Sequence, residues 1–452
     1  MNNFFKRSKL VFGLACIAIA CSGETYKDDL NDIKDLVDTT SYPVVDIFPE
    51  NKKQKIISIG GNYPQANYTT EAWDLVGRNT IEQFKPSHVR VALPLQFYGV
   101  SYETYSGEKI LQQPRVISLL NSMREMKEDY GVVNFTVSVW RVANELVENP
   151  EDQNKRRIKP DKYHEVIDMI EAFLLAAKNE YGVEADYFSF NESNGGYMTL
   201  FSPEESITFI KMAGERFESA GLKTIFLWGD TSSTKTTVPF ASAIAADPSV
   251  VKYLGPLSFH SWWSETEPNT IFEEVAALAK QYDRPVWCTE LGHHALAHQT
   301  PGYNLDWDYA FRFAKISHRV FRYSNTEVSM FWTWQKNYEI MSADTLTKYP
   351  IYYLTRHQTD HFNGLQLVHS ESSEEDILPL AGYNDDNRLV LQLINLKAEP
   401  ITIRVPQVSS TNATMLTSTE ANLWEKTNMV FDSTAKGAYL KLKAESVNTI
   451  IF

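Results

Sequence analysis

The chain has 452 residues, of which 43% are hydrophobic and 13% aromatic, a composition typical of a globular protein with a substantial core and not of a disordered one. Lysine and arginine number 43 against 57 aspartates and glutamates, and the net charge of −14 argues against nucleic acid and other polyanions as partners. No glycine-rich phosphate loop or nucleotide fingerprint is present, so we expect no cofactor.

The first 21 residues have the pattern of a secretory signal. Basic residues at positions 6 to 9 precede an apolar stretch at 10–20, which is too short for a membrane span. Ala18-Ile19-Ala20-Cys21 resembles a bacterial lipobox. That resemblance implies lipidation of Cys21 and anchoring to the cell envelope, at the outer membrane or cell surface of a Gram-negative bacterium. An ordinary secreted protein is the alternative.

Residues 22–50 form an acidic, polar tract that we interpret as a tether. The tract resembles the acidic export signals of surface lipoproteins in Bacteroidetes. Its end, 43–48, is predicted to add a strand to the C-terminal domain. With Cys21 modified, Cys288 is the only cysteine of the mature chain, so no internal disulfide is possible.

Residues 51–362 are predicted to form a catalytic barrel, because apolar strand-like runs alternate there with amphipathic helical ones, such as 161–181 and 203–220 after Ser202. Eight is the number of strands that closes a parallel (β/α)8 TIM barrel. The expected strands are 55–60, 88–93, 132–140, 185–191, 223–228, 257–260, 285–290 and 327–332.

The pattern changes near Gly364 to short alternating runs broken by turn residues. Seven or eight closely spaced strands over 363–452 indicate a small antiparallel β-sandwich. We expect this domain to buttress the barrel by covering its apolar surface.

Two predicted strands lead into a glutamate. The fourth ends in Asn191-Glu192 and the seventh in Glu290. Barrel strands direct their carboxyl ends to one mouth, and the fourth and seventh lie across the barrel, so both carboxylates can reach one cleft. Cleavage of a glycosidic bond requires such a pair, and the Asn191 amide could hold a sugar hydroxyl. The other interpretation is that both glutamates are ordinary polar residues at strand ends.

A strand-four Asn-Glu with a strand-seven Glu resembles clan A of the retaining glycoside hydrolases. The attached sandwich and the ending 446–451 resemble family 30 and its relatives, including family 39, although Ser193 replaces the usual proline after Asn-Glu. The resemblance implies that Glu192 is the acid/base, Glu290 the nucleophile, and Arg90 the strand-two arginine that keeps Glu290 ionised. Glu192 would begin protonated, a state favoured by the nearby Glu290 charge and partial desolvation.

Several further residues are candidates for substrate binding. His260 ends the sixth strand, where clan members often place a His or Tyr near the nucleophile, and Trp332 or Trp334 closes the eighth, where they carry a tryptophan under the sugar. For each of these, core packing is the alternative. Residues that could line the same mouth are Asn62, Tyr63, Trp140, Trp228 with Asp230, and Trp262 or Trp263.

His293, His294 and His298 raise the question of a metal site. No carboxylate lies between the last two as in a zinc protease helix, and we predict none. Cys288 is interpreted as a packing residue, because no base for a thiol nucleophile is identifiable.

Taken with the resemblance to clan A, the two glutamates predict a monomeric retaining β-glycosidase that acts on a poly- or oligosaccharide by double displacement. The alternative is a non-catalytic glycan-binding lipoprotein on a barrel scaffold.

Overall fold

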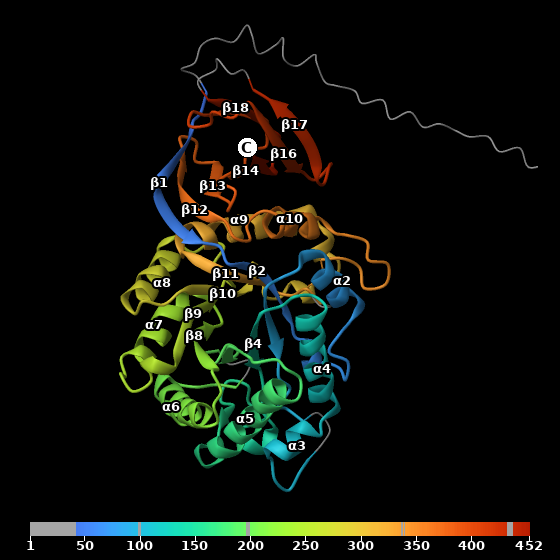
Figure 1. Cartoon of the computed structure of the whole chain (residues 1–452), viewed down its shortest axis with the longest axis vertical. Coiled ribbons are helices and arrows are strands. Elements are labelled where there is room, and N and C mark those ends of the chain that lie inside the picture. Colours follow the sequence, from blue (N-terminus) through green and yellow to red (C-terminus); the bar gives the residue numbers. More distant parts are fainter. Residues whose placement is uncertain (1–41, 98–100, 196–198, 336–337, 339, 432–436) are drawn as a thin grey trace, which may run out of the picture. The chain divides into compact units, whose positions relative to one another are not determined.

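The computed structural model describes residues 42–97, 101–195, 199–335, 338, 340–431 and 437–452. The predicted signal segment, Cys21 and most of the acidic tract lie outside these residues. From Pro43 onward the chain forms one compact unit (Figure 1). None of the helices in the described part of the chain is long and apolar enough to cross a membrane.

Eight parallel strands form a closed barrel in chain order, with the last strand pairing with the first. They are β2 (Ser58–Tyr63), β3 (His88–Ala92), β4 (Asn134–Val139), β7 (Tyr187–Phe190), β8 (Ile225–Thr231), β9 (Leu254–His260), β10 (Val286–Leu291) and β11 (Thr326–Phe331). All eight expected strands are confirmed. The first begins three residues later than expected, because Lys55 still belongs to the preceding strand β1 (Val45–Lys55).

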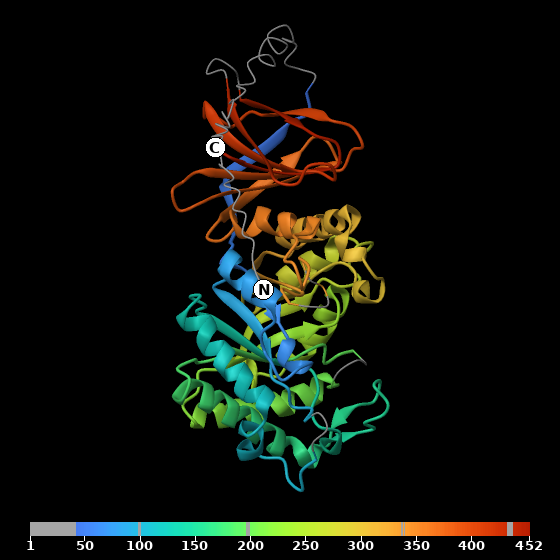
Figure 2. The same cartoon turned by 90° about the vertical axis from the view of Figure 1, so that its right-hand side faces the viewer.

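Helices cover the outside of the barrel (Figures 1 and 2). They are α2 (Leu75–Phe84), α3 (Gly107–Leu111), α4 (Pro114–Glu128), α5 (Tyr163–Asn179), α6 (Pro203–Ser219), α7 (Thr234–Ala245), α8 (Thr270–Gln281), α9 (Trp307–Tyr323) and α10 (Pro350–Thr359). The two predicted helices are α5 and α6. Ser202 caps α6 as expected. Its hydroxyl accepts a hydrogen bond from the Glu205 N–H, and the Glu205 carboxylate accepts one from the Ser202 N–H.

Short elements occupy the connections. They are the 3-10 turns η1 (Gln65–Asn67), η2 (Asn144–Leu146), η3 (Pro160–Lys162), η4 (Val251–Tyr253), η5 (Ala297–Gln299) and η6 (Tyr303–Leu305), and the strand pair β5 (Val147–Glu148) and β6 (Arg157–Ile158). The β5–β6 pair lies in the long loop after β4.

The C-terminal region contains two antiparallel sheets with a common core, which confirms the predicted sandwich. The larger has the order β1, β12 (Gln366–Ser372), β13 (Ile377–Tyr383), β14 (Leu389–Asn395), β19 (Ser446–Ile451), β16 (Asn412–Ser418) and β17 (Glu425–Val430). The smaller pairs β15 (Ile401–Val405) with β18 (Ala438–Leu442). β1 pairs with β12 from Val45 as far as Lys55.

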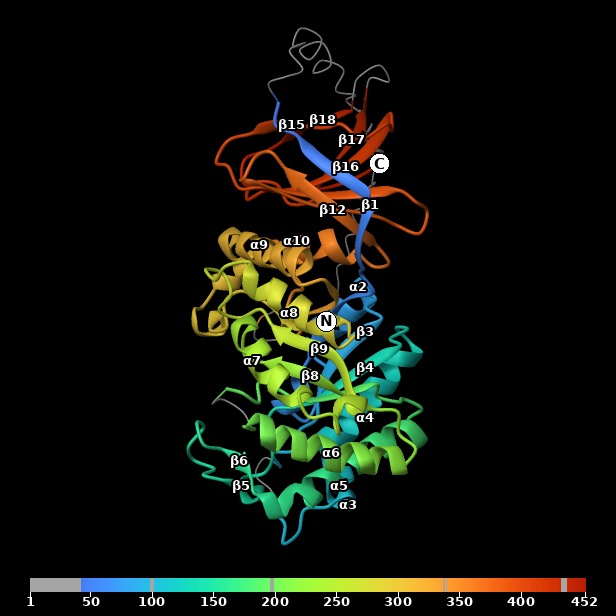
Figure 3. The same cartoon turned by 90° about the vertical axis from the view of Figure 1, so that its left-hand side faces the viewer.

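The helices α9 and α10 lie between the barrel and the sheets (Figures 1 and 3). A buried apolar cluster crosses this junction, joining Ile59 of the barrel and Phe321 of α9 to Phe362, Leu367 and Leu380. The sheets therefore cover apolar surface of the barrel and its helices, which would otherwise face water.

Candidate active site

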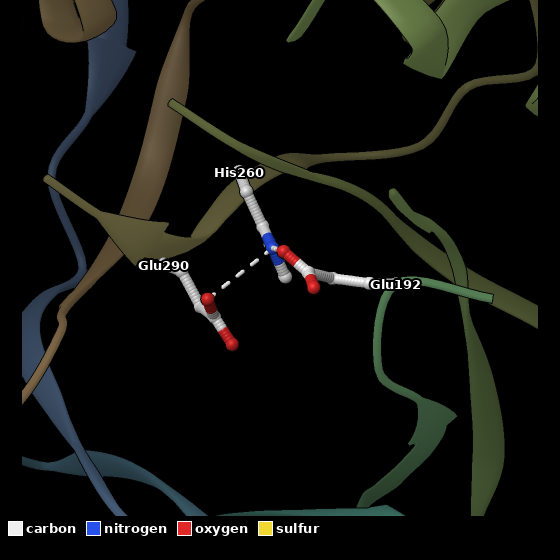
Figure 4. A group of neighbouring side chains, drawn as sticks. All are labelled: Glu192, His260 and Glu290. Atoms are coloured by element: carbon white, nitrogen blue, oxygen red, sulfur yellow. Dashed lines mark hydrogen bonds and ion pairs between the residues drawn. The ribbon is translucent and has the colours of Figure 1, made fainter. Parts of the chain in front are cut away.

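The carboxyl ends of β7, β9 and β10 bring three titratable side chains together (Figure 4). Glu192 follows β7, His260 ends β9, and Glu290 lies near the end of β10. One carboxylate oxygen of each glutamate and one ring nitrogen of His260 all lie within 4.8 Å of one another. The two glutamates that the sequence singled out therefore share one site.

The backbone holds Glu192 in an unusual conformation. Its φ of 50° lies in the left-handed region, which costs a non-glycine residue about 1–3 kcal/mol. The Glu192 N–H donates to the Asp230 carbonyl oxygen at 2.9 Å, which ties the turn after β7 to the end of β8. The side chain keeps 16% of its surface exposed, so it remains accessible from the mouth.

Glu290 is buried and accepts hydrogen bonds at both carboxylate oxygens. Arg90 Nη1 donates to Oε1 at 2.9 Å, and the Trp262 indole donates to Oε2, also at 2.9 Å. Burial raises the pKa of the Glu290 carboxyl, while the positive charges of His260 and Arg90 and the Trp262 donor act in the opposite direction. The position is thus furnished with the donors that an ionised carboxylate needs.

Arg90 is fully buried in the barrel interior and orients the polar groups around it. It donates to Asn62 Oδ1 and Ser138 Oγ at 3.0 Å, to Asp230 Oδ2 at 2.9 Å, and to Asn191 Oδ1. The Arg90 guanidinium therefore has two carboxylate partners, Asp230 and Glu290. Asn191 is therefore held by Arg90 within the same network.

His260 lies between carboxylates from three other segments of the barrel. Its Nδ1 lies 3.4 Å from Glu192 Oε1 and 3.3 Å from Glu290 Oε2, and its Nε2 lies 3.3 Å from Asp230 Oδ1. Burial opposes the charged form, yet the Glu290 charge and the hydrogen bonds to Asp230 and Glu192 raise the pKa of His260 to about 9.

The structure contradicts the prediction that Trp228 lines the cleft. Its indole is fully buried and donates to the Ala241 carbonyl oxygen of α7 at 2.7 Å. Strand alternation would put residues 228 and 230 on one face, but the register of β8 shifts here, with φ of 108° at Gly229 and 47° at Asp230. A Cβ at Gly229 would lie 2.3 Å from the Ser258 carbonyl oxygen. This bulge turns Trp228 toward the helices and Asp230 toward the site.

Trp334 is also a core residue, contrary to the prediction that it could lie under the sugar. It is fully buried and packs against Phe84 at a centroid distance of 4.9 Å, in space left by Gly61, where a Cβ would lie 2.4 Å from the indole. Trp332 is different, because it is only partly buried and packs beside Trp140 at 5.7 Å.

Trp140 in turn lies under the Arg90 guanidinium, whose carbon is 4.7 Å from the ring centroid. The structure therefore places Trp140 and Trp332 next to the charged groups, with Trp332 the more exposed of the two. Trp263 is 55% exposed, one residue beyond Trp262, and has a φ of 61°.

Three of the groups in the network were weak or secondary candidates from the sequence. Asn62 and Asp230 contact Arg90 directly, and Trp262 rather than Trp263 contacts Glu290. Tyr338 was not singled out at all. Its ring lies 6.0 Å from Trp262, and burial and the Glu290 charge raise the pKa of its hydroxyl.

The loop histidines have separate partners. His298 Nδ1 lies 3.1 Å from the Tyr338 hydroxyl, His294 Nδ1 accepts from the Leu296 N–H, and His293 packs against the Tyr309 ring at 4.8 Å. Among the described residues, Glu192, His260 and Glu290 are the one trio with ligand-type atoms close enough for a common metal ion. Burial and the Glu290 charge raise the pKa of the Cys288 thiol, which suits a packing residue.

No protein-family model matches the sequence, and no curated protein matches it. Solved structures share its fold. A GH30 endoxylanase from Clostridium papyrosolvens C71 superposes with a TM-score of 0.71 at 15% identity, over 90% of this chain and 99% of that one. A family 30 subfamily 8 xylanase from Clostridium acetobutylicum gives 0.71 at 16%, over 90% and 99%. An endo-β1,6-glucanase gives 0.67 at 14%, over 92% and 95%. The chain therefore has the barrel-plus-β-domain fold of these glycoside hydrolases.

Proposed function

We propose that this protein is a retaining β-glycosidase that hydrolyses O-glycosidic bonds of a poly- or oligosaccharide by double displacement. The observation that carries the proposal is the approach of Glu192 and Glu290 oxygens to within 4.8 Å of one another. Retaining enzymes hold their carboxyl groups about 5–5.5 Å apart, whereas inverting enzymes need about 6.5–9.5 Å to admit a water molecule. The fold shared with xylanases and a β-1,6-glucanase adds support.

In the first step, an oxygen of ionised Glu290 attacks the anomeric carbon while Glu192 donates its proton to the leaving glycosidic oxygen. The bond from the anomeric carbon to that oxygen breaks, and a glycosyl ester forms on Glu290. Arg90 and Trp262 fix the two Glu290 oxygens before the attack, so little reorganisation is needed.

In the second step, Glu192, now ionised, removes a proton from a water molecule whose oxygen attacks the same carbon. The ester bond breaks, Glu290 regains its charge and Glu192 its proton. Two inversions leave the anomeric configuration unchanged. Trp332 is partly exposed and packs beside Trp140, which lies under Arg90, and we assign Trp332 a sugar-stacking role.

A digest of plant, algal, fungal and host glycans with protein lacking residues 1–21 tests the function. Products are measured by mass and chromatography for the wild type, for Glu290→Gln, and for Glu215→Gln, the same change on the exposed face of α6. We expect products from the wild type and Glu215→Gln and none from Glu290→Gln. Equal binding of one glycan by all three without products would favour the non-catalytic alternative.

The roles of the two glutamates are tested with azide on an activated aryl glycoside. Glu192→Ala should recover turnover with azide and give a glycosyl azide of retained configuration, because the azide anion displaces Glu290 from the glycosyl ester without needing a base to remove a proton. Glu290→Ala should instead yield a glycosyl azide of inverted configuration. Exchanged phenotypes would reverse the assignment.

We also propose that residues 1–21 direct export and that Cys21 carries the lipid anchor, which would hold the enzyme at the cell envelope of a Gram-negative bacterium. The support is the sequence pattern described above. Mass spectrometry of the mature N-terminus should show a lipidated Cys21, which Cys21→Ser abolishes and the matched control Cys16→Ser retains. A secreted wild-type protein whose Cys21 carries no lipid would contradict the anchor.

A further inference from the structure

Two cations and two carboxylates in the site contact one another in an alternating ring, which we call the charge ring: Arg90, Asp230, His260 and Glu290. Each carboxylate uses a different oxygen for each cation. Asp230 accepts from Arg90 at Oδ2 and faces His260 with Oδ1. Glu290 accepts from Arg90 at Oε1 and faces His260 with Oε2.

The ring alternates in charge only if His260 is protonated on both nitrogens. A neutral imidazole has one N–H and one lone pair. A lone pair on Nε2 would face the Asp230 Oδ1 oxygen at 3.3 Å. A lone pair on Nδ1 would face Glu290 Oε2 at 3.3 Å and Glu192 Oε1 at 3.4 Å, where it could be satisfied only by the proton that Glu192 must give to the leaving oxygen. The imidazolium alone donates to both sides, and His260 is completely buried, so water cannot take the place of a missing donor.

Several neighbours keep the Asp230 carboxylate ionised. Besides Arg90 it accepts from the Thr289 hydroxyl at 2.5 Å, and its own N–H donates to Ser258 Oγ at 3.0 Å. Burial opposes its ionisation, but the Arg90 charge keeps the pKa of the Asp230 carboxyl below its ordinary value. Asp230 is therefore a positioning residue that acts through His260.

We propose that His260 is an imidazolium at neutral pH, held by Asp230, and that it serves as the fixed counter-ion around which the negative charge of the reaction moves between Glu290 and Glu192. The charge state of His260 does not depend on the proposed hydrolysis. The role of His260 in turnover rests on that proposed function.

The charges balance through both steps. In the resting site Arg90 and His260 are positive, Asp230 and Glu290 are negative, and protonated Glu192 is neutral. After the ester forms on Glu290, that residue is neutral and Glu192, having given its proton to the leaving oxygen, is negative. His260 Nδ1 lies 3.3 Å from Glu290 and 3.4 Å from Glu192, so the negative charge stays beside the same cation in both states.

The groups that face His260 from the elements around it agree with this assignment. They are Glu192 after β7, Asp230 of β8 and Glu290 of β10, all carboxyl groups, and from α7 the uncharged Thr234, whose hydroxyl donates to the His260 carbonyl oxygen at 3.1 Å. The other cation of the ring, Arg90, contacts the opposite oxygens of the two shared carboxylates.

Nitrogen NMR of the resting protein with labelled histidine rings tests the charge state without any substrate. The His260 signals are assigned by their disappearance in His260→Gln, and His357, a buried histidine of α10 with hydroxyl partners, is the internal control. We expect two protonated ring nitrogens for His260 at pH 7.5, deprotonating near pH 9, while His357 stays neutral. A neutral His260 at pH 7.5 would overturn the proposal and leave the hydrolase assignment standing.

Asp230→Asn tests the role in turnover. Loss of a charge-assisted hydrogen bond should lower kcat/KM at pH 8 by about ten- to hundredfold, with a much smaller loss at pH 5.5, where His260 is protonated without help. The alkaline limb of the pH profile should move toward pH 7. An equal loss at both pH values would show a merely structural role and overturn the proposal. If the variant does not fold, the NMR titration of the wild type still decides the charge state.

Discussion

Two completely buried histidines lie in opposite environments, His260 in the barrel mouth and His357 beneath the C-terminal sheets. His260 faces three carboxyl groups. The His357 ring lies 2.9 Å from Thr449 Oγ1 and 3.0 Å from Ser418 Oγ, with the Trp424 ring at 4.9 Å. The pKa of His260 is raised to about 9, and burial lowers that of His357 to about 3.

The difference shows that burial alone does not decide the charge of a histidine. Desolvation disfavours the imidazolium at both positions, and only the mouth supplies the negative charges that outweigh it. The junction with the sheets instead combines apolar packing with neutral hydrogen bonds, as at His318, whose Nε2 lies 3.0 Å from the Pro379 carbonyl oxygen. The mouth therefore favours a charged histidine, and the junction favours a neutral one.

The largest effect should come from breaking the junction. Removal of residues 365–452 takes away β12 to β19 and leaves β1 without its partner strand, and it exposes Ile59 and Phe321. Because this buried apolar surface would face water, we expect insoluble protein. The measurement is the soluble fraction after expression, compared with the full mature chain. A soluble fragment that unfolds cooperatively and hydrolyses substrate would contradict the buttressing role.

Arg90→Met should have the next largest effect, because it leaves two buried carboxylates, Asp230 and Glu290, with His260 as their one remaining cation. We expect the free energy of unfolding to fall by about 3–5 kcal/mol, measured by urea denaturation. The matched control is Arg216→Met, which breaks a pair with Asp168 and Glu171 at the surface, where the arginine side chain is 35% exposed. That change should cost about 1 kcal/mol or less. Similar losses for the two variants would show that the buried carboxylates of the mouth depend no more on their arginine than exposed ones do.

The charge of His260 should appear in the pH dependence of stability. Its pKa is raised from 6.5 to about 9 on folding, so its contribution is fully present below pH 6.5 and is lost as the pH rises to 9. The loss should reach about 3 kcal/mol in the free energy of unfolding. Urea denaturation at pH 6.5 and pH 9 should show this loss in the wild type and not in His260→Gln. Parallel losses in both proteins would rule out a raised pKa.

The sequence could predict those features of the site that follow from the strand on which a residue lies, and it could not predict those that depend on contacts with other strands. Glu192 and Glu290 were predictable because each lies in or directly after an apolar barrel strand, and parallel strands bring their carboxyl ends to one mouth. Arg90 was predicted from its match to the strand-two arginine of the clan that the sequence resembles. His260 was predicted near Glu290 from the resemblance to clan members, which often place a His or Tyr at the end of the sixth strand. Its charge was not, since that depends on Glu290 and also on Asp230, whose side chain reaches His260 because of the bulge in β8.

The misplaced tryptophans failed for another physical reason. Alternation along β8 would point Trp228 into the cleft, but the bulge at Gly229 and Asp230 reverses its direction. Trp334 fills space that exists because residue 61 is a glycine, on a strand that neighbours β11 in the barrel but lies far from it in the sequence. The strand pattern carries no sign of either event, because a bulge and a void arise from contacts between strands.

The smallest effect should come from titrating the neutral histidine of the junction. On folding, the pKa of His357 falls from 6.5 to about 3, so its contribution to stability is present above pH 6.5 and is lost as the pH falls toward 3. At pH 5 the loss should be about 2 kcal/mol in the free energy of unfolding, opposite in direction to that of His260. His357→Gln keeps a polar group of similar size near Thr449 and Ser418 but cannot titrate. Urea denaturation at pH 7 and pH 5 should therefore show a smaller decrease for the variant than for the wild type. An unchanged decrease would mean that His357 accepts a proton within the fold, and the contrast between the two regions would then rest on the mouth alone.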